Sequence, residues 1–178
     1  MIPLTPSFLI AAATSLVRDP EEGATGCAAA AFVHHVGYMS HFQYGAERSS
    51  WPLPSTASCA ALAQYASNED VLREEPAPGD VFLLWHAPTA TFEHTGIVAR
   101  VRDAGVTPGG TPWVDCDTIE GNGGADDNRT GDAAMTGVVR RVRRFYPTAT
   151  VGDRFIRWVD LDRRWMAGDP LQTAVRVA

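Results

Sequence analysis

The sequence changes character once, and this change limits the folds that are available to the chain. Its first third is rich in alanine and has helical periodicity over residues 8–18, 27–36 and 57–66. After the turn-forming segment 74–80, short apolar or alternating runs predict strands instead. Helices followed by consecutive antiparallel strands are typical of an α+β domain. The sequence therefore predicts N-terminal helices packed on an antiparallel β-sheet.

Capping and helix-breaking residues predict the ends of these helices. We expect the first helix to begin near Ser7 and to end at Asp19-Pro20. Gly37 is expected to stop the second helix, and Ser55 or Ser58 to cap the third. Strands are expected at residues 81–85, 95–101, 113–120 and 135–145. Two interpretations of the tail stay open, because residues 155–159 fit either a helical face or a closing strand.

Charge and hydropathy exclude several partners. The 178 residues form one domain, with a formal charge of −6 and a pI near 5.3, which argue against nucleic acid and membrane surfaces. No run approaches the ~18 apolar residues of a membrane span. Residues 8–17 are similar to a short signal-peptide core, but residues 1–7 contain no Lys or Arg. We therefore expect no clear signal peptide and a first helix that packs on the core, in a protein synthesised in the cytoplasm.

Cys27 is the first candidate for a chemical role. It follows Thr25, a good helix-capping residue, and begins the predicted helix 27–36. The unpaired backbone N–H groups and the dipole of a helix start favour the thiolate, which is the nucleophilic form of cysteine. The alternative is that Cys27 is only a small buried apolar residue.

His94, Glu120 and Asn122 complete the candidate site. His94 opens one predicted strand, and Glu120 and Asn122 share parity at the end of a neighbouring strand. A cysteine, a histidine and a carboxylate on separate elements are what thiol-based acyl transfer requires. The histidine stabilises the thiolate and protonates the leaving amine, while the carboxylate fixes the ring tautomer. The backbone N–H of Cys27 is one expected oxyanion donor, and the second donor stays unassigned.

Four segments in this order resemble a known family. They are Cys27–Val33, Pro78–Phe82, His94–Val98 and Thr118–Asn122. Together they are similar to the CHAP domains, the cysteine- and histidine-dependent amidohydrolases/peptidases, over about residues 21–142. The resemblance implies a papain-like fold and catalysis by the four site residues above. It makes residues 1–178 a single catalytic domain, with a core at about 21–145 and a C-terminal extension at 146–178.

The sequence departs from the family pattern at three points. Gly26 stands where a bulky aromatic residue is usual before the cysteine, and Thr95 stands where valine is usual after the histidine. The connection from His94 to Glu120 is longer than common, which predicts an extended hairpin. The related NlpC-type cell-wall peptidases typically have a histidine at the third position, so Glu120 favours the CHAP interpretation.

The resemblance implies cleavage of an amide bond in bacterial peptidoglycan without a metal or cofactor. The activity would be that of a muramoyl-alanine amidase or of a peptide endopeptidase. The protein would be a phage lysin, a virion-associated hydrolase or a secreted effector. The enzyme would reach the wall after release, virion delivery or secretion, with a virion or a secretion apparatus as partner. Two alternatives stay open: a non-catalytic CHAP-like module of a phage or secretion particle, and an amidohydrolase of a small peptide conjugate.

Other candidate ligands have simpler interpretations. The histidines at 34, 35, 41 and 86 lack a zinc-binding spacing such as HExxH, so no zinc is expected. The aspartates at 115, 117, 126, 127 and 132 lack an EF-hand pattern, which favours a solvated acidic loop over a calcium site. Cys59 and Cys116 are expected to be structural.

The arginine cluster and the tryptophans also have a default interpretation. The arginines at 140, 141, 143 and 144 predict a solvated edge strand, with anionic wall polymer or a protein partner as the alternative. Trp51, Trp85 and Trp113 are expected in the core, with a glycan groove as the alternative.

Overall fold

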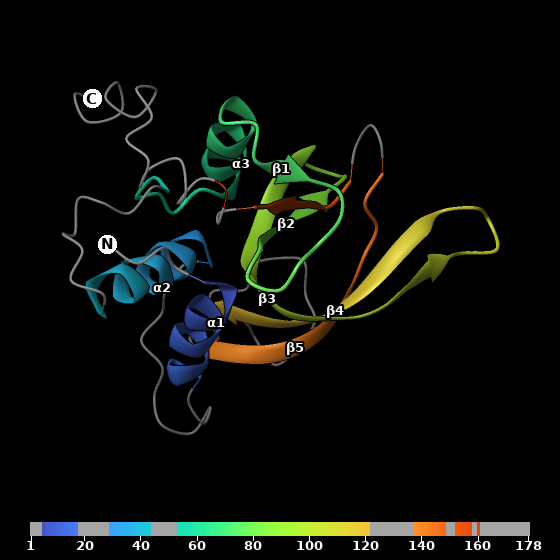
Figure 1. Ribbon diagram of the computed structural model, residues 1–178. Helices are drawn as coiled ribbons and strands as arrows, with labels where there is room; N and C mark the ends of the chain where they lie inside the picture. Colours follow the sequence, from blue (N-terminus) through green and yellow to red (C-terminus); the bar gives the residue numbers. More distant parts are fainter. Residues whose placement is uncertain are drawn as a thin grey trace.

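A computed structural model describes residues 5–17, 29–43, 53–121, 137–148, 152–157 and 160. These residues form three helices and one six-stranded antiparallel sheet with the strand order β1-β6-β2-β3-β4-β5 (Figure 1). The helices are α1 (Pro6–Ser15), α2 (Ala29–Gln43) and α3 (Cys59–Asn68). The strands are β1 (Leu72–Arg73), β2 (Val81–His86), β3 (Thr91–Val106), β4 (Pro112–Gly121), β5 (Val138–Phe145) and β6 (Arg154–Ile156). The predicted α+β architecture, with N-terminal helices on an antiparallel sheet, is confirmed.

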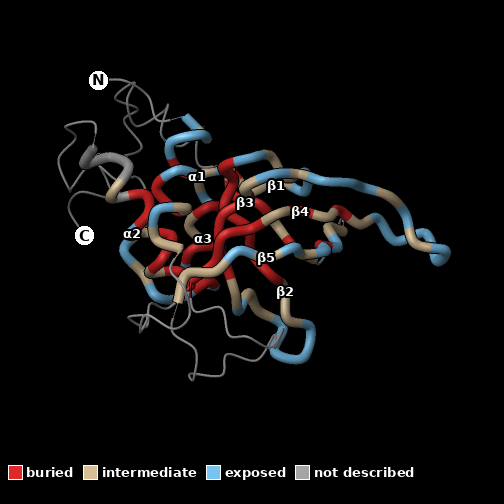
Figure 2. The backbone as a smooth tube through the Cα atoms, turned by 90° about the horizontal axis from the view of Figure 1, so that it is seen from below, coloured by how far each residue is buried: buried red, intermediate tan, exposed pale blue. Residues whose placement is uncertain are grey.

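The main core lies between the helices and one face of the sheet. Leu9 of α1, Phe32 of α2 and Leu62 of α3 are buried there. Val81, Ile97 and Ile119, one from each central strand, are fully buried against them. Burial is concentrated where the helices meet β2, β3 and β4, as Figure 2 shows in red. We call this face of the sheet the helix face.

A second cluster covers the opposite face, which we call the inner face. It contains Phe82, Val98, Cys116, Phe145 and Phe155, all completely buried. The ring of Phe145 lies 5.2 Å from Phe82 and 5.2 Å from Phe155, between centroids. Phe145 belongs to the outer strand β5, whereas Phe155 lies on β6, with three strands between them in the sheet. The sheet therefore curls around this cluster.

A buried carboxylate holds this curl closed. Asp153, which is 5% exposed, accepts hydrogen bonds from the backbone N–H of Trp85 at 3.0 Å and of Tyr146 at 2.8 Å. Its two oxygens thus join the end of β2 to the chain that follows β5. A buried carboxylate that accepts two backbone hydrogen bonds satisfies its own polar atoms and two otherwise unpaired donors.

Both ends of α1 differ from the predictions. α1 begins after Thr5, with Pro6 in its first turn, rather than near Ser7. Proline suits this position because a backbone N–H in the first turn has no partner within the helix, so its absence loses no hydrogen bond. The helix ends at Ser15, before the predicted stop at Asp19-Pro20, which lies outside the described residues. Leu9 and Ala13 of α1 are buried, so this helix does pack on the core as expected.

Gly37 does not stop the second helix. α2 continues through it to Gln43, and both Val36 and Gly37 are buried. A glycine inside a helix costs about 1 kcal/mol relative to alanine, and burial of the surrounding apolar face outweighs this cost. The third helix begins as predicted, because the Ser58 side chain accepts a hydrogen bond from the N–H of Ala61 at 3.2 Å.

The strands follow the sequence pattern, with two additions. The four expected strands correspond to β2, β3, β4 and β5, and β1 was not expected. β6 confirms a closing strand within the tail, while Trp165 and Met166 lie outside the described residues. β3 has 16 residues and forms with β4 a long hairpin that extends away from the helices (Figure 1). The predicted extended hairpin between His94 and Glu120 is therefore present.

No helix among the described residues is long and apolar enough to cross a membrane.

Candidate active site

His94 and Glu120 meet on the inner face of the sheet. The Nε2 atom of His94 on β3 lies 2.8 Å from the Oε2 atom of Glu120 on the neighbouring strand β4. The Glu120 side chain is fully buried, whereas the His94 side chain is 20% exposed. The imidazole thus has one nitrogen fixed inside the protein and a ring that is still partly accessible to solvent.

Regular alternation with Gly96 and Val98 gives His94 this direction, and a β-bulge lies directly before it in β3. In the β2–β3 register Leu84 pairs with His94, but the next residue, Trp85, pairs with Phe92. Glu93 is therefore an extra residue in β3. Phe92 packs against the core on the helix face and against Trp85, while the His94 ring lies 5.9 Å from Phe82 on the inner face. The bulge therefore re-aims Phe92, which simple alternation would place on the same face as His94.

Three further side chains surround the Glu120 carboxylate. Arg143 of β5 donates from Nε to Oε1 and from Nη2 to Oε2, which is a bidentate pair. The Thr118 hydroxyl donates to Oε1, and the Nε atom of Arg141 lies 3.9 Å from Oε2. Both carboxylate oxygens are thus held by donors from three strands. This fixes the plane of the carboxylate before any substrate arrives.

These donors keep Glu120 ionised. Burial by itself would raise the pKa of this carboxyl, but the hydrogen bond from His94 and the hydrogen bonds and charge of Arg143 lower it to about 2. An ionised carboxylate can only accept hydrogen bonds, so the Nε2 atom of His94 must carry the proton between them. In the neutral imidazole the Nδ1 atom then has the free lone pair. Nδ1 is therefore the nitrogen that can act as a base.

Arg143 is the site residue that the sequence interpretation missed. β5 is indeed the outer strand of the sheet, as the arginine cluster predicted, and Arg140 and Arg144 are exposed. The prediction of solvated side chains is wrong for Arg141 and Arg143, which are only 18% and 15% exposed. Alternation along a strand directs residues 139, 141 and 143 to the face that carries Glu120. A buried carboxylate on the adjacent strand was the signal that could have identified them.

The exposed arginines of β5 have partners on the helix face. Arg144 donates two hydrogen bonds to Asp115, at 2.8 and 2.7 Å, and its guanidinium lies 3.9 Å from the centre of the Trp113 ring. Arg140 donates to the hydroxyl of Thr14 in α1 at 3.1 Å.

The tryptophans differ from the prediction that they lie in the core. Trp113 and Trp85 are only half-buried, which corrects the core assignment for both, and Trp51 lies outside the described residues.

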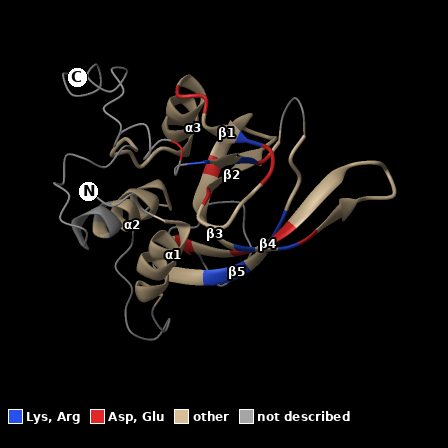
Figure 3. Ribbon diagram, viewed as in Figure 1, with Lys and Arg blue, Asp and Glu red and all other residues tan. Residues whose placement is uncertain are grey.

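The predicted acidic loop is partly a strand. Asp115 and Asp117 lie on β4, and Asp117 accepts hydrogen bonds from Arg100, at 2.8 Å, and from Arg102. Arginine guanidinium groups therefore pair with both of these carboxylates. Figure 3 shows the acidic and basic positions of the sheet strands in red and blue. The aspartates at 126, 127 and 132 lie outside the described residues.

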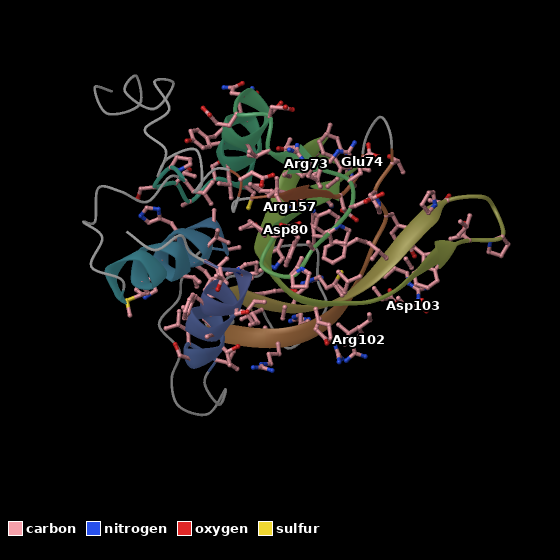
Figure 4. All side chains as sticks on the ribbon, in the orientation of Figure 1. Arg73, Glu74, Asp80, Arg102, Asp103 and Arg157 are labelled. Carbon is pink, nitrogen blue, oxygen red and sulfur yellow. The ribbon has the colours of Figure 1, made fainter. Side chains whose placement is uncertain are left out.

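The Pro78–Phe82 segment has a structural role at the start of β2. Asp80 is 1% exposed, and Arg157 donates from Nε to its two oxygens at 2.9 and 3.1 Å (Figure 4). Burial raises the pKa of Asp80 to about 6, against the opposing effect of Arg157. Gly79 has a φ of +90°, and Pro6 of α1 lies where a Cβ would be. The segment therefore turns the chain into β2 and docks α1.

The remaining candidate ligands do not gather into a metal site. Within the described ranges, no group of three or more His, Cys, Asp or Glu residues could hold a metal ion. His34, His35 and His41 lie on α2, while His86 contacts Thr89 at 2.8 Å and Glu93 at 3.0 Å. Cys59 and Cys116 are buried, as expected of structural thiols, and burial raises their pKa values to about 11 and about 12.

Of the four predicted site residues, the structure brings together His94 and Glu120, while Cys27 and Asn122 lie outside the described residues. No protein-family model, curated protein or solved structure matches the chain. The similarity to CHAP domains rests on the sequence motifs and stays a prediction.

Proposed function

We propose that this protein hydrolyses an amide bond of peptidoglycan with Cys27 as nucleophile, His94 as acid and base, Glu120 as the orienting carboxylate and Asn122 as an assisting group. One observation carries the proposal, the hydrogen bond between Nε2 of His94 and the buried carboxylate of Glu120. A histidine held by a buried carboxylate, with its second nitrogen available, is the arrangement that activates a nucleophile in many hydrolases.

The proposed reaction has two stages. The Cys27 thiolate attacks the amide carbonyl, the C–N bond breaks, and the Nδ1–H of the His94 imidazolium gives its proton to the leaving amine. This leaves a thioester and a neutral imidazole. The Nδ1 atom then takes a proton from water, whose oxygen attacks the thioester, and the carboxylic acid and the cysteine are released. Glu120 stays ionised throughout and supports the imidazolium through Nε2.

α2 packs on the helix face of the sheet, opposite the inner face on which His94 and Glu120 meet, so the proposal requires the chain before α2 to bring Cys27 to the edge of the sheet beside His94. Cys27 stands two residues before Ala29, where the description of α2 begins, and α2 packs on β3 and β4, the strands of His94 and Glu120. Phe32 lies against Gly121, the residue after Glu120. The mechanism requires the Cys27 sulfur within about 4 Å of Nδ1. A papain-like arrangement of helices and sheet is part of this proposal.

The substrate class follows from the motif resemblance. Peptidoglycan offers both the muramoyl-alanine amide and the amides of its peptides, and the proposal covers both bonds. Action on the wall would follow release, virion delivery or secretion. The rival functions predict different products, because a non-catalytic module cuts nothing and an amidohydrolase of small conjugates cuts only short peptide amides.

Mass spectrometry of muropeptides distinguishes these functions. Purified peptidoglycan is incubated with wild type, with Cys27→Ala and with Cys59→Ala as the matched control. We expect new amine and carboxyl ends with wild type and Cys59→Ala, and none with Cys27→Ala, whose fold is checked by circular dichroism. Full activity of Cys27→Ala would contradict the mechanism. Failure of wild type to cut peptidoglycan and small peptide amides alike would favour the non-catalytic module.

A further inference from the structure

We propose that Arg143 is a positioning residue that fixes the Glu120 carboxylate and sets how strongly this carboxyl group binds a proton. The inference deepens the proposed function and rests on it for the catalytic consequence. The effect on proton binding concerns Glu120, whose contact with Arg143 the structure shows. It can be measured without any hydrolysis.

The geometry of Arg143 points to this role. In the β4–β5 register Arg143 lies opposite Cys116, four residues before Glu120 on β4. Its side chain therefore runs along the strand to reach the carboxylate, and its fork contacts both oxygens. A planar guanidinium matches a carboxylate in this way, whereas a lysine ammonium acts as a point charge. The carboxylate plane, and with it the direction of the bond to His94, is thereby fixed.

Every strand packed around Glu120 contributes a group that favours its charged form. β3 contributes His94, β4 contributes the Thr118 hydroxyl, and β5 contributes Arg141 and Arg143. Arg143 is the cation with direct hydrogen bonds to both oxygens. Because the carboxylate is buried, this charge is little screened by solvent. Its removal leaves His94 and the more distant Arg141 to oppose the cost of burial.

The direction of the effect follows from the sign of the charge. A fixed cation repels protons from groups beside it, so Arg143 lowers the proton affinity of Glu120. Without Arg143, Glu120 takes up a proton at a higher pH. The acidic limb of the activity profile should therefore move upward, because the mechanism needs Glu120 ionised. An opposite charge within about 4–6 Å shifts a carboxyl by roughly 1–3 pH units, so a movement of about one unit is expected.

Three variants separate charge from geometry. Arg143→Gln removes the charge and the fork. Arg143→Lys keeps the charge and loses the fork. Arg140→Gln is the matched control, because it removes an equal charge from the same strand on the helix face, where Arg140 is exposed and contacts Thr14.

The first readout is nuclear magnetic resonance of ¹³C-labelled Glu120 carboxyl and His94 ring carbon as pH is varied. In wild type and Arg140→Gln, we expect Glu120 to stay ionised over the pH range in which the protein is folded. In Arg143→Gln, we expect Glu120 to take up its proton at a pH that is higher by about one unit or more. Identical titrations in wild type and Arg143→Gln would overturn the inference, whether or not the protein cuts peptidoglycan. If Arg143→Gln does not fold, the equally neutral Arg143→Met takes its place, and its Glu120 titration should move upward in the same way, whereas that of Arg143→Lys should stay near wild type.

The second readout is kcat/KM against pH on whichever amide wild type cleaves. The acidic limb should move upward in Arg143→Gln and stay in place in Arg140→Gln. Arg143→Lys should keep this limb in place but turn over more slowly, because the carboxylate plane is no longer fixed. Unchanged kcat in Arg143→Lys would show that the fork is dispensable and would overturn the positioning role. If wild type cleaves no amide but Glu120 titrates as expected in the variants, the proposed function is contradicted and the effect of Arg143 on Glu120 stands.

Discussion

Phe32 of α2 lies directly against the backbone of Gly121 at the end of β4. A Cβ atom at Gly121 would come within 2.3 Å of the Phe32 Cβ atom, which no side chain can tolerate. Gly121 immediately follows Glu120, and Phe32 is five residues after Cys27. This one close contact therefore sets the distance between the helix that follows the proposed nucleophile and the strand that carries its carboxylate.

Replacement of Gly121 should disturb the site from the helix face, opposite the face on which His94 and Glu120 meet. Gly121→Ala must push α2 away from β4, and overpacking of this kind costs about 1–3 kcal/mol of unfolding free energy. We expect a fall in amide hydrolysis at temperatures where the variant is still fully folded, because the helix has moved. Urea unfolding and the hydrolysis assay measure the two effects separately.

Gly109→Ala is the control for this prediction. Gly109 lies in the turn between β3 and β4, where the nearest atom to an added Cβ is the Thr107 hydroxyl at 3.8 Å. Its replacement should change stability by less than about 0.5 kcal/mol and leave activity intact. Equal behaviour of the two variants would show that the contact between Phe32 and Gly121 does not set the helix position.

The three cysteines should differ sharply in reactivity. Burial raises the pKa of Cys59 to about 11 and that of Cys116 to about 12, so both are thiols at neutral pH. A Cys27 that serves as nucleophile should be a thiolate and should react first with iodoacetamide at pH 7. Peptide mass spectrometry follows each cysteine, and activity should fall in step with Cys27 labelling. Complete labelling of Cys27 without loss of activity would contradict its role.

Much of this fold could be predicted from the sequence, because periodicity reports which faces are buried. The sheet, the three helices and the long hairpin follow from alternation and from turn residues. The end of α2 could not be predicted, because burial of Val36 and Gly37 outweighs the helix-breaking tendency of glycine. Such burial is a property of the tertiary structure.

The direction of Phe92 beside His94 depends on a feature that the sequence pattern conceals, whereas alternation along β3 and β4 accounts for the direction of His94 and Glu120. Simple alternation places Phe92 and His94 on the same face, whereas the bulge at Glu93 separates them. Arg143 was missed for a related reason. A cluster of arginines resembles a solvated edge until the buried carboxylate on the adjacent strand is known.

Glu120 should make stability depend on pH in a defined window. Despite its burial, hydrogen bonds from His94 and Arg143 lower its pKa from 4.5 to about 2, so the folded state binds its proton less tightly than the unfolded state. Its contribution to stability is therefore complete above about pH 5 and is lost as the pH falls toward 2. Denaturant unfolding at pH 6, 4 and 3 should show wild type losing stability faster than Glu120→Gln. A constant difference between the two proteins would contradict the assignment.

Glu120→Gln should also reveal how the carboxylate acts in catalysis. The amide keeps the size and one acceptor oxygen but has no charge to support the His94 imidazolium, and its NH₂ group cannot accept from Arg143. Turnover should fall by about 10²- to 10⁴-fold without disappearing, as when an orienting carboxylate is removed from other triads. Asp115→Asn is the matched control, because it makes the same change on β4 at the carboxylate that pairs with Arg144. It should retain wild-type turnover. With both variants confirmed as folded by circular dichroism, equal activity would mean that Glu120 serves the fold alone, and that His94 is oriented by another group.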